Sequence, residues 1–319
     1  MPREALIGVG AGLTSAAASL AFIAEIPFAL VLVYFSPLPL MAAGLAAGIR
    51  ATIIGSIVGL LAIASAGGGF AALVFCIIQA FPSTFLVYLA LIRRQSIVQR
   101  TTQPNFVWFP LGHIAAYLGL FGGSLLIILA IFSSDPGLSS LISNHLEKAV
   151  TIMAPHLPTE TRLSFTEMLT PLFPGAVATS WIIMIVINGL LAQRLVVHLD
   201  RNIRPRAKYS AIDLPNWLSW PLISAAAVTL TGSAEWEYVG RNTAMVFATP
   251  YFLLGLAVVH NVAERVTYRG PLLIFLYIVT ILSLWAALVV AGIGIVEQWI
   301  GIRNRTQTLP KQSCGGNEN

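Results

Sequence analysis

The chain has 319 residues, of which 57% are hydrophobic and only 10% are charged. A soluble domain carries about 25% charged residues, whereas the mean hydropathy here is +0.82. This composition excludes a soluble globular protein and predicts an integral membrane protein whose first partner is the lipid bilayer. The net charge of +5 does not indicate a nucleic-acid partner, because the basic residues lie in short segments between apolar runs.

Long apolar runs in lipid form helices, because lipid offers the backbone no hydrogen-bond partner. A membrane span needs about 20 residues. Nine runs approach this length: 5–24, 27–49, 51–66, 69–92, 109–132, 172–193, 215–232, 240–263 and 271–296. We therefore predict an all-α polytopic membrane protein with 8–9 transmembrane helices. Residues 1–305 form a single transmembrane domain, and 306–319 form a disordered tail.

The basic residues predict the orientation, because short cytoplasmic loops are enriched in Lys and Arg. They follow the fourth, sixth and eighth runs. We expect the N-terminus and residues 93–108 and 194–214 in the cytoplasm, and a multi-pass protein of the inner (plasma) membrane. Segment 133–171 is then an extracytoplasmic loop, and its apolar spacing predicts amphipathic helices lying on the membrane. The basic residues at the C-terminal end fit eight crossings, which would place this end in the cytoplasm, better than nine. The side of the membrane on which the C-terminus lies is left open.

The sequence Ser36-Pro37-Leu38-Pro39 interrupts the second apolar run. Proline has no N–H, so the carbonyls of Val33 and Phe35 lose their helical donors. With Ser36 as N-cap and Pro37 as first helical residue, a new half-helix would begin at the bilayer midplane. Such helix starts form ligand sites in transporters, and Tyr34 would add an aromatic wall and a hydroxyl.

A plain proline kink, satisfied by neighbouring helices, is the alternative to a binding site at this break. Pro82 and Pro250 interrupt two further runs. Under the predicted topology these runs and the second one cross the membrane in the same direction. Bends shared by parallel helices would open a cavity on one side.

Two other groups of residues are candidates for function. Gly8, Gly12 and Ala16 form a small-residue face that lets a helix approach closely. Its partner is either another helix of this chain or a membrane partner subunit. His113, Asn188 and Asn242 are polar residues within spans, where such residues are functional suspects. Hydrogen bonding between helices is the alternative role for them.

No catalytic or metal-binding pattern accompanies these residues. The sequence contains no H-E-x-x-H, G-x-S-x-G, Walker A or C-x-x-C motif. His145 and His156 share one loop without an evident third ligand, so no metal site is expected. We expect no enzyme activity and no cofactor.

Several stretches resemble the YybS-like family of predicted membrane proteins over nearly the whole chain. They are SPLPLMAAGLAAG (36–48), LVYLALIRR (86–94), LPNWLSWPLI (214–223), RNTAMVFATPYFLLGLAVVH (241–260) and AGIGIVEQWIGIRNR (291–305). Glu297 stands where that family usually has Asp. The N-terminal part is also similar to the substrate-binding S subunits of energy-coupling factor transporters.

This resemblance implies an S-subunit-like core with added C-terminal helices that binds a small-molecule ligand for uptake. It would dock on a membrane partner through the small residues of its first helix. The extra C-terminal spans depart from the six-helix plan of S subunits. A structural or assembly protein that binds other membrane proteins is the alternative.

Overall fold

The structure is a computed structural model that describes residues 2–22, 27–96, 105–133, 135–206, 212–264, 266 and 268–301. The N-terminal half contains α1 (Arg3–Leu20), α2 (Ala29–Tyr34), α3 (Pro37–Ala47), α4 (Ile49–Phe75), a π-helical turn (Cys76–Ala80) and α5 (Phe81–Leu91). Strands β1 (Arg93–Ser96) and β2 (Asn105–Trp108) follow.

The remaining elements are again almost entirely helical. They are α6 (Leu111–Phe132), α7 (Leu138–Met153), α8 (Thr159–Leu169), α9 (Phe173–His198), α10 (Ser219–Thr231), α11 (Ala234–Ala263), α12 (Arg269–Leu282) and α13 (Leu284–Ile300). Short 3₁₀ turns, Thr170–Leu172 and Asn216–Leu218, precede α9 and α10.

The all-α, polytopic membrane character is confirmed. Within the described residues, five helical stretches are long and apolar enough to cross a membrane: Ala29–Ala47, Ile49–Leu91, Leu111–Phe132, Thr159–His198 and Ala234–Ala263. Helices α12 and α13 add a sixth if the pair, bent by 117°, is one span. The count of eight or nine crossings stays a prediction.

The stretch Ile49–Leu91 folds back on itself. Its 43 residues would extend about 65 Å as one straight helix, twice the hydrocarbon thickness. The helix breaks at Gly68, whose φ of 82° suits glycine. Beyond the break the chain returns, and the Ser56 and Thr84 hydroxyls lie 3.0 Å apart. The predicted runs 51–66 and 69–92 are thus the two arms of this stretch.

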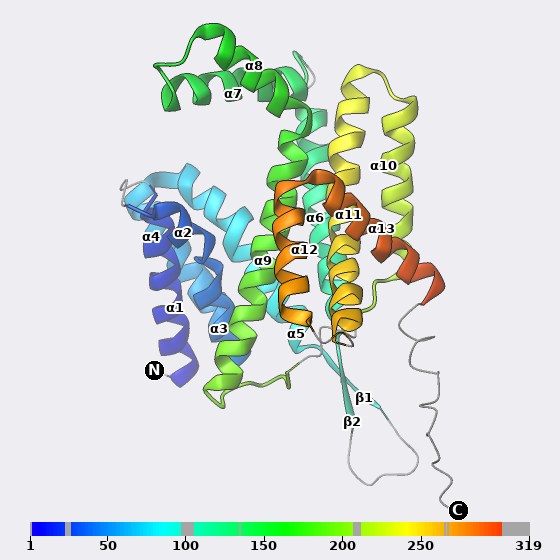
Figure 1. The fold of residues 1–319 in the computed structure, drawn as a ribbon. Coiled ribbons are helices and arrows are strands. Elements are labelled where there is room, and N and C mark those ends of the chain that lie inside the picture. The colour runs from blue at the N-terminus through cyan, green and yellow to red at the C-terminus, as the bar shows by residue number, and fades with distance from the viewer. Residues whose placement is uncertain are drawn as a thin grey trace, which may run out of the picture.

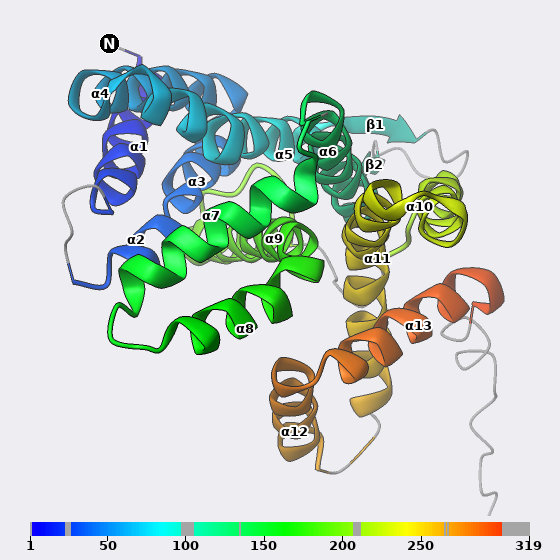
Figure 2. The ribbon, with the colours of Figure 1, turned by 90° about the horizontal axis from the view of Figure 1, so that it is seen from above.

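Figures 1 and 2 show the helices arranged as a bundle with two distinct ends. Helices α7 and α8 lie across one end. The β1–β2 hairpin lies at the opposite end, where α1 also begins. In this antiparallel hairpin Arg93 pairs with Trp108. The sequence prediction treated 93–108 as an irregular loop, so the hairpin is an addition.

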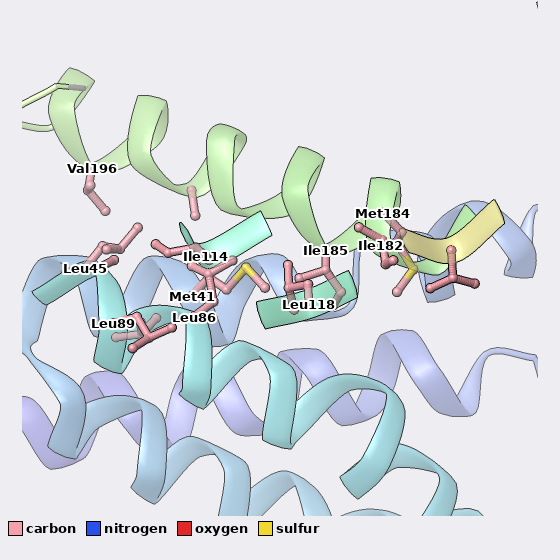
Figure 3. Packing of buried hydrophobic residues seen from close by; sticks show 14 of the residues in the cluster. Met41, Leu45, Leu86, Leu89, Ile114, Leu118, Ile182, Met184, Ile185 and Val196 are labelled. Atoms are coloured by element: carbon pink, nitrogen blue, oxygen red, sulfur yellow. The ribbon is translucent and has the colours of Figure 1, made fainter. Parts of the chain in front are cut away.

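A common core joins the two halves of the chain (Figure 3). Met41 of α3, Leu86 of α5, Leu118 of α6 and Ile185 of α9 are all buried within it. Val246 brings α11 into the same cluster. Since lipid is as apolar as these side chains, close packing rather than exclusion of water holds such a core together.

Helices α7 and α8 lie in segment 133–171, for which the sequence predicts helices. A carboxylate on α11 ties them to the bundle: Glu235 accepts hydrogen bonds from the N–H groups of Leu138 (2.6 Å) and Ser139 (3.2 Å) and from the Ser139 hydroxyl (2.6 Å). A negative charge at a helix N-terminus is stabilising. The two helices also expose apolar side chains, with Ile152 and Met153 about four-fifths exposed at 79% and 83%.

The small-residue face of α1 packs inside the chain. A Cβ atom added to Gly8 would lie 2.6 Å from the Ala51 carbonyl oxygen, and one added to Gly12 would collide with the carbonyl of Gly55. Ala16 is buried in a cluster with Leu40 of α3. The sequence left open whether this face packs inside the chain or against a partner subunit. In the structure it packs inside the chain, against α4.

We expect Gly12→Ala to destabilise the protein by about 1–3 kcal/mol, because the added methyl forces two helix backbones apart. Gly10 provides a matched control on the same helix, since a Cβ there would meet no atom within 4 Å. Gly10→Ala should be neutral or slightly stabilising. Unfolding free energies in detergent measure both, and equal values for the two variants would contradict the internal packing.

Candidate functional site

A cavity of about 890 Å³ lies among α5, α6, α9 and α11. Its apolar wall is built from residues on all four helices: Leu86, Ile114, Val186, Leu190, Pro250 and Leu253. Its polar lining consists of Gln193, Arg204, Arg206, His260, Glu264 and Tyr277. Pro250, one of the prolines expected to bend parallel helices, is therefore in the cavity wall.

The polar groups gather near one end of the bundle. Gln193 lies near the C-terminal end of α9, and Glu264 directly follows α11. Pro250 lies ten residues before His260, which is about 15 Å along the helix. The cavity thus runs from a polar rim into an apolar interior. The ends of α9 and α11 that carry this rim lie toward β1–β2 (Figure 1).

Arg204 builds much of this rim, and its side chain is only 6% exposed. Its guanidinium donates to the carbonyls of Ala90 at the end of α5 (3.2 Å) and of Phe109 before α6 (2.9 Å). The carbonyl of Arg204 in turn accepts a bond from Gln193 Nε2 (3.0 Å). Arg204 therefore satisfies the Ala90 carbonyl at the end of α5 and the Phe109 carbonyl ahead of α6, and fixes the segment after α9 against α5 and α6.

His260 and Tyr277 connect α11 to α12 at the cavity. His260 Nδ1 lies 2.8 Å from the Leu256 carbonyl, and Tyr277 Oη lies 3.2 Å from His260 Nε2. A carbonyl can only accept, so Nδ1 carries a proton, and in the neutral ring Nε2 accepts from the tyrosine hydroxyl. No other α12 residue lines the cavity, and no residue of α12 is buried. Helix α12 thus contacts the cavity mainly through Tyr277, at the cavity's edge.

At the Ser36–Pro39 break, the backbone carbonyls of Val33 to Ser36 all accept hydrogen bonds. Val33 O accepts from the Ser36 N–H (3.2 Å) and hydroxyl (2.8 Å), and Phe35 O accepts from the Leu38 N–H (3.1 Å). Helices α9 and α1 supply the other donors. Asn188 Nδ2 donates to Tyr34 O (2.8 Å), and the Ser15 hydroxyl donates to Ser36 O (2.7 Å).

The predicted helix start at Pro37 is confirmed, because α3 begins there with Ser36 in the N-cap position, but the predicted cap by the Ser36 side chain is wrong. Ser36 is itself helical, with φ −61° and ψ −28°, and its side chain makes no capping bond. Its hydroxyl points back to Val33 because that carbonyl lost its donor to Pro37. The segment Ala29–Ala47 counts as one span, so the break is a kink satisfied by neighbouring helices.

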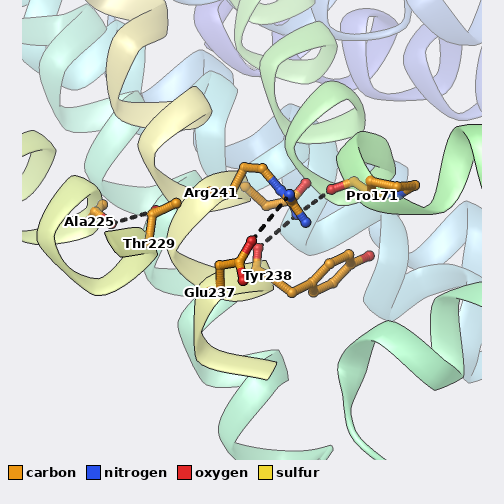
Figure 4. A network of polar contacts seen from close by, with 7 residues as sticks. Pro171, Ala225, Thr229, Glu237, Tyr238 and Arg241 are labelled. Atoms are coloured by element: carbon orange, nitrogen blue, oxygen red, sulfur yellow. Dashed lines mark hydrogen bonds and ion pairs between the residues drawn. The ribbon is translucent and has the colours of Figure 1, made fainter. Parts of the chain in front are cut away.

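Asn242 and His113, the other predicted binding residues, lie in separate parts of the fold. Asn242 accepts from the Gly175 N–H (2.8 Å) and donates to the carbonyls of Pro171 (3.0 Å) and Tyr238 (2.9 Å), which joins α11 to the start of α9. Figure 4 shows this corner with the nearby Arg241–Glu237 ion pair, 3.5 Å apart. His113 packs edge-on against Phe109, with ring centres 5.6 Å apart.

The structure brings Tyr34 and Ser36 together with Asn188, whereas His113 and Asn242 lie elsewhere. None of the predicted binding residues belongs to the cavity lining: Tyr34, Ser36, Pro37, Pro39, His113, Asn188 and Asn242. Their role in ligand binding stays a prediction.

Sequence reasoning missed the polar rim. Arg204 and Arg206 were interpreted as orientation signals, and nothing within that basic run distinguishes the buried Arg204 from its exposed neighbours. His260 and Glu264 fall at the end of a span, where a polar residue is ordinary. Only the folded chain shows that these ends converge on one cavity.

The comparisons with known proteins bear on the whole chain. A family model described as "Predicted membrane protein (DUF2232)" matches residues 15–297. The chain belongs to the DUF2232 family. No curated protein and no solved structure matches it. Membership in DUF2232 supports the membrane character and names no ligand.

The kink yields a prediction about Asn188. Asn188→Leu should cost about 1 kcal/mol of unfolding free energy, because Tyr34 O loses its donor within the membrane. The loss should shrink in a Pro37→Ala/Pro39→Leu background, since a restored helix returns the Leu38 N–H to Tyr34 O.

Asn242→Leu is the matched control for this double-mutant cycle, because Asn242 is equally buried but bonds to other elements. Its cost should be the same in both backgrounds. An Asn188→Leu cost that does not depend on the two prolines would contradict the assignment.

Proposed function

We propose that this DUF2232 protein binds a small molecule in the cavity between α9 and α11 and acts as the ligand-binding component of a membrane transport system. It is a binding protein rather than an enzyme. The observation that carries the proposal is the cavity itself. Its volume of about 890 Å³ falls within the range of about 300–1,000 Å³ that is usual for small-molecule sites.

The composition of the wall supports the same conclusion. Ligand sites are mostly apolar with a few polar groups that fix orientation, and this cavity combines aliphatic side chains with six polar or charged ones. The polar and ionisable groups lie together at one end of the cavity, where they would orient a ligand. The resemblance of the N-terminal part to S subunits of transporters, which rests on the sequence alone, points toward ligand capture as well.

The proposal includes an orientation. The basic residues Arg93, Arg94, Arg201 and Arg206 lie at the end of the bundle that carries the polar rim. Under the positive-inside rule this end faces the cytoplasm, in the plasma membrane. The cavity then opens toward the cytoplasmic side rather than beside the Ser36–Pro39 kink.

A structural or assembly role is the second candidate. It relied on the small residues of α1 as a surface for partners, and α4 occupies that surface here. Helix α12, with no buried residue, still offers an apolar surface to such a partner. The cavity therefore favours ligand binding over assembly.

Filling the cavity tests the proposal. Native mass spectrometry of the protein purified from membranes should show a bound small molecule. Leu253→Trp should remove it, because the indole occupies the apolar wall of the cavity. Leu129→Trp is the matched control: it makes the same change on α6 at a side chain that is 47% exposed and outside the cavity lining.

Loss of the bound species in Leu253→Trp with retention in Leu129→Trp is the expected result. Equal retention in both variants would reject the cavity as the binding site. Leu190→Trp, on the opposite helix α9, repeats the test should Leu253→Trp not fold.

A further inference from the structure

The ligand class can be inferred from the distribution of charge and apolar surface in the cavity, provided that the proposed function is right. We infer that the cavity takes an amphiphilic anion, with a phosphate or carboxylate head at the arginine rim and an apolar chain along α9 and α11. Three features of the lining support this inference.

The first feature is the positive charge of the rim. Two guanidinium groups, Arg204 and Arg206, line it together with a single carboxylate, Glu264. Guanidinium groups stay charged at all physiological pH values and match carboxylate and phosphate geometry. Arg206 is exposed, so it can reach a ligand head without breaking the helix-end bonds that Arg204 makes.

The second feature is the separation of polar and apolar lining. Polar side chains occur near the helix ends, at Gln193, His260 and Glu264, whereas Val186 and Pro250 line the cavity deeper in the bundle. The interior lies about 15 Å along α11 from the rim. A compact, uniformly polar solute would leave this interior unfilled, while an apolar chain would bury itself there.

The third feature is the access route. The cavity wall is formed by helices that span the bilayer, and α12 contributes Tyr277 alone. Since no residue of α12 is buried, the Tyr277–His260 hydrogen bond is a main tie between α12 and the cavity. An amphiphile already dissolved in the membrane would reach the cavity by displacing α12, with its head staying at the interface.

Four probes separate the parts of this inference. Thermal unfolding of the full-length protein in maltoside detergent is followed with decyl phosphate, decanol, decyltrimethylammonium and inorganic phosphate. Decyl phosphate alone should raise Tm in a saturable manner, because a ligand that binds the folded state stabilises it. Decanol tests the chain without charge, inorganic phosphate tests the charge without the chain, and the ammonium compound reverses the charge.

Two charge variants locate the head. Arg206→Gln should weaken the apparent affinity for decyl phosphate about tenfold, as expected for loss of one charge-assisted contact. Arg201→Gln is the matched control, because it removes the same charge from the same exposed segment but does not line the cavity. Its affinity should equal that of the wild type.

The outcomes distinguish this inference from the proposed function. Equal stabilisation by decanol, or stronger stabilisation by decyltrimethylammonium, would overturn the anionic head while cavity binding stands. Equal stabilisation by inorganic phosphate would overturn the apolar chain. Equal weakening by Arg206→Gln and Arg201→Gln would show a diffuse surface effect and overturn the assigned site. If no probe binds while the native ligand is still lost in Leu253→Trp, only the ligand class is wrong.

Discussion

The structure depends on one constraint: a backbone polar group within a bilayer finds its partner inside the protein or has none. The kink at Pro37 and Pro39 shows how the chain meets it. Local N–H groups turn to the carbonyls that the prolines left without donors, and Asn188 and Ser15 supply donors from α9 and α1. Arg204 meets the same need at the rim for the Ala90 carbonyl at the end of α5 and for the Phe109 carbonyl. Polar residues that bind helices together in this way are not thereby ligand residues.

The same constraint explains where a ligand fits. The kink is closed by its neighbours: Ser36 and Leu40 are fully buried, and Met41 of α3 packs in one cluster with Ile185 of α9. The open space lies instead between α9 and α11, near the ends of the helices, where Gln193, His260 and Glu264 line a cavity. Arg204 fixes the segment after α9 beneath α5 and α6, and this segment supplies the basic part of the rim. The short segment after α9 thus both positions the rim and supplies its basic side chains.

Composition and periodicity were sufficient to predict an all-α membrane protein, because lipid permits few other solutions for a chain so apolar. Apolar spacing also predicted helices in 133–171 and separate runs over 51–66 and 69–92, where the structure has α7, α8 and the two arms of Ile49–Leu91. The site was not predicted. Proline signals a kink without saying whether neighbouring side chains satisfy it, and that answer lay 154 positions away in Asn188. In the sequence, Arg204 and Arg206 look like any other basic residues that set the membrane orientation. Only the packing of the helices brings them together with other helix ends at one cavity.

An experimental structure of the protein in a lipid nanodisc, prepared without added ligand, tests the central claim most directly. The account predicts elongated density between α9 and α11, with its wider end beside Arg206 and its tail toward Pro250 and Leu253. It also predicts no density at the Ser36–Pro39 kink, where Asn188 bonds to Tyr34 O. A cavity closed by direct packing of α9 on α11, or ligand density at the kink, would contradict it.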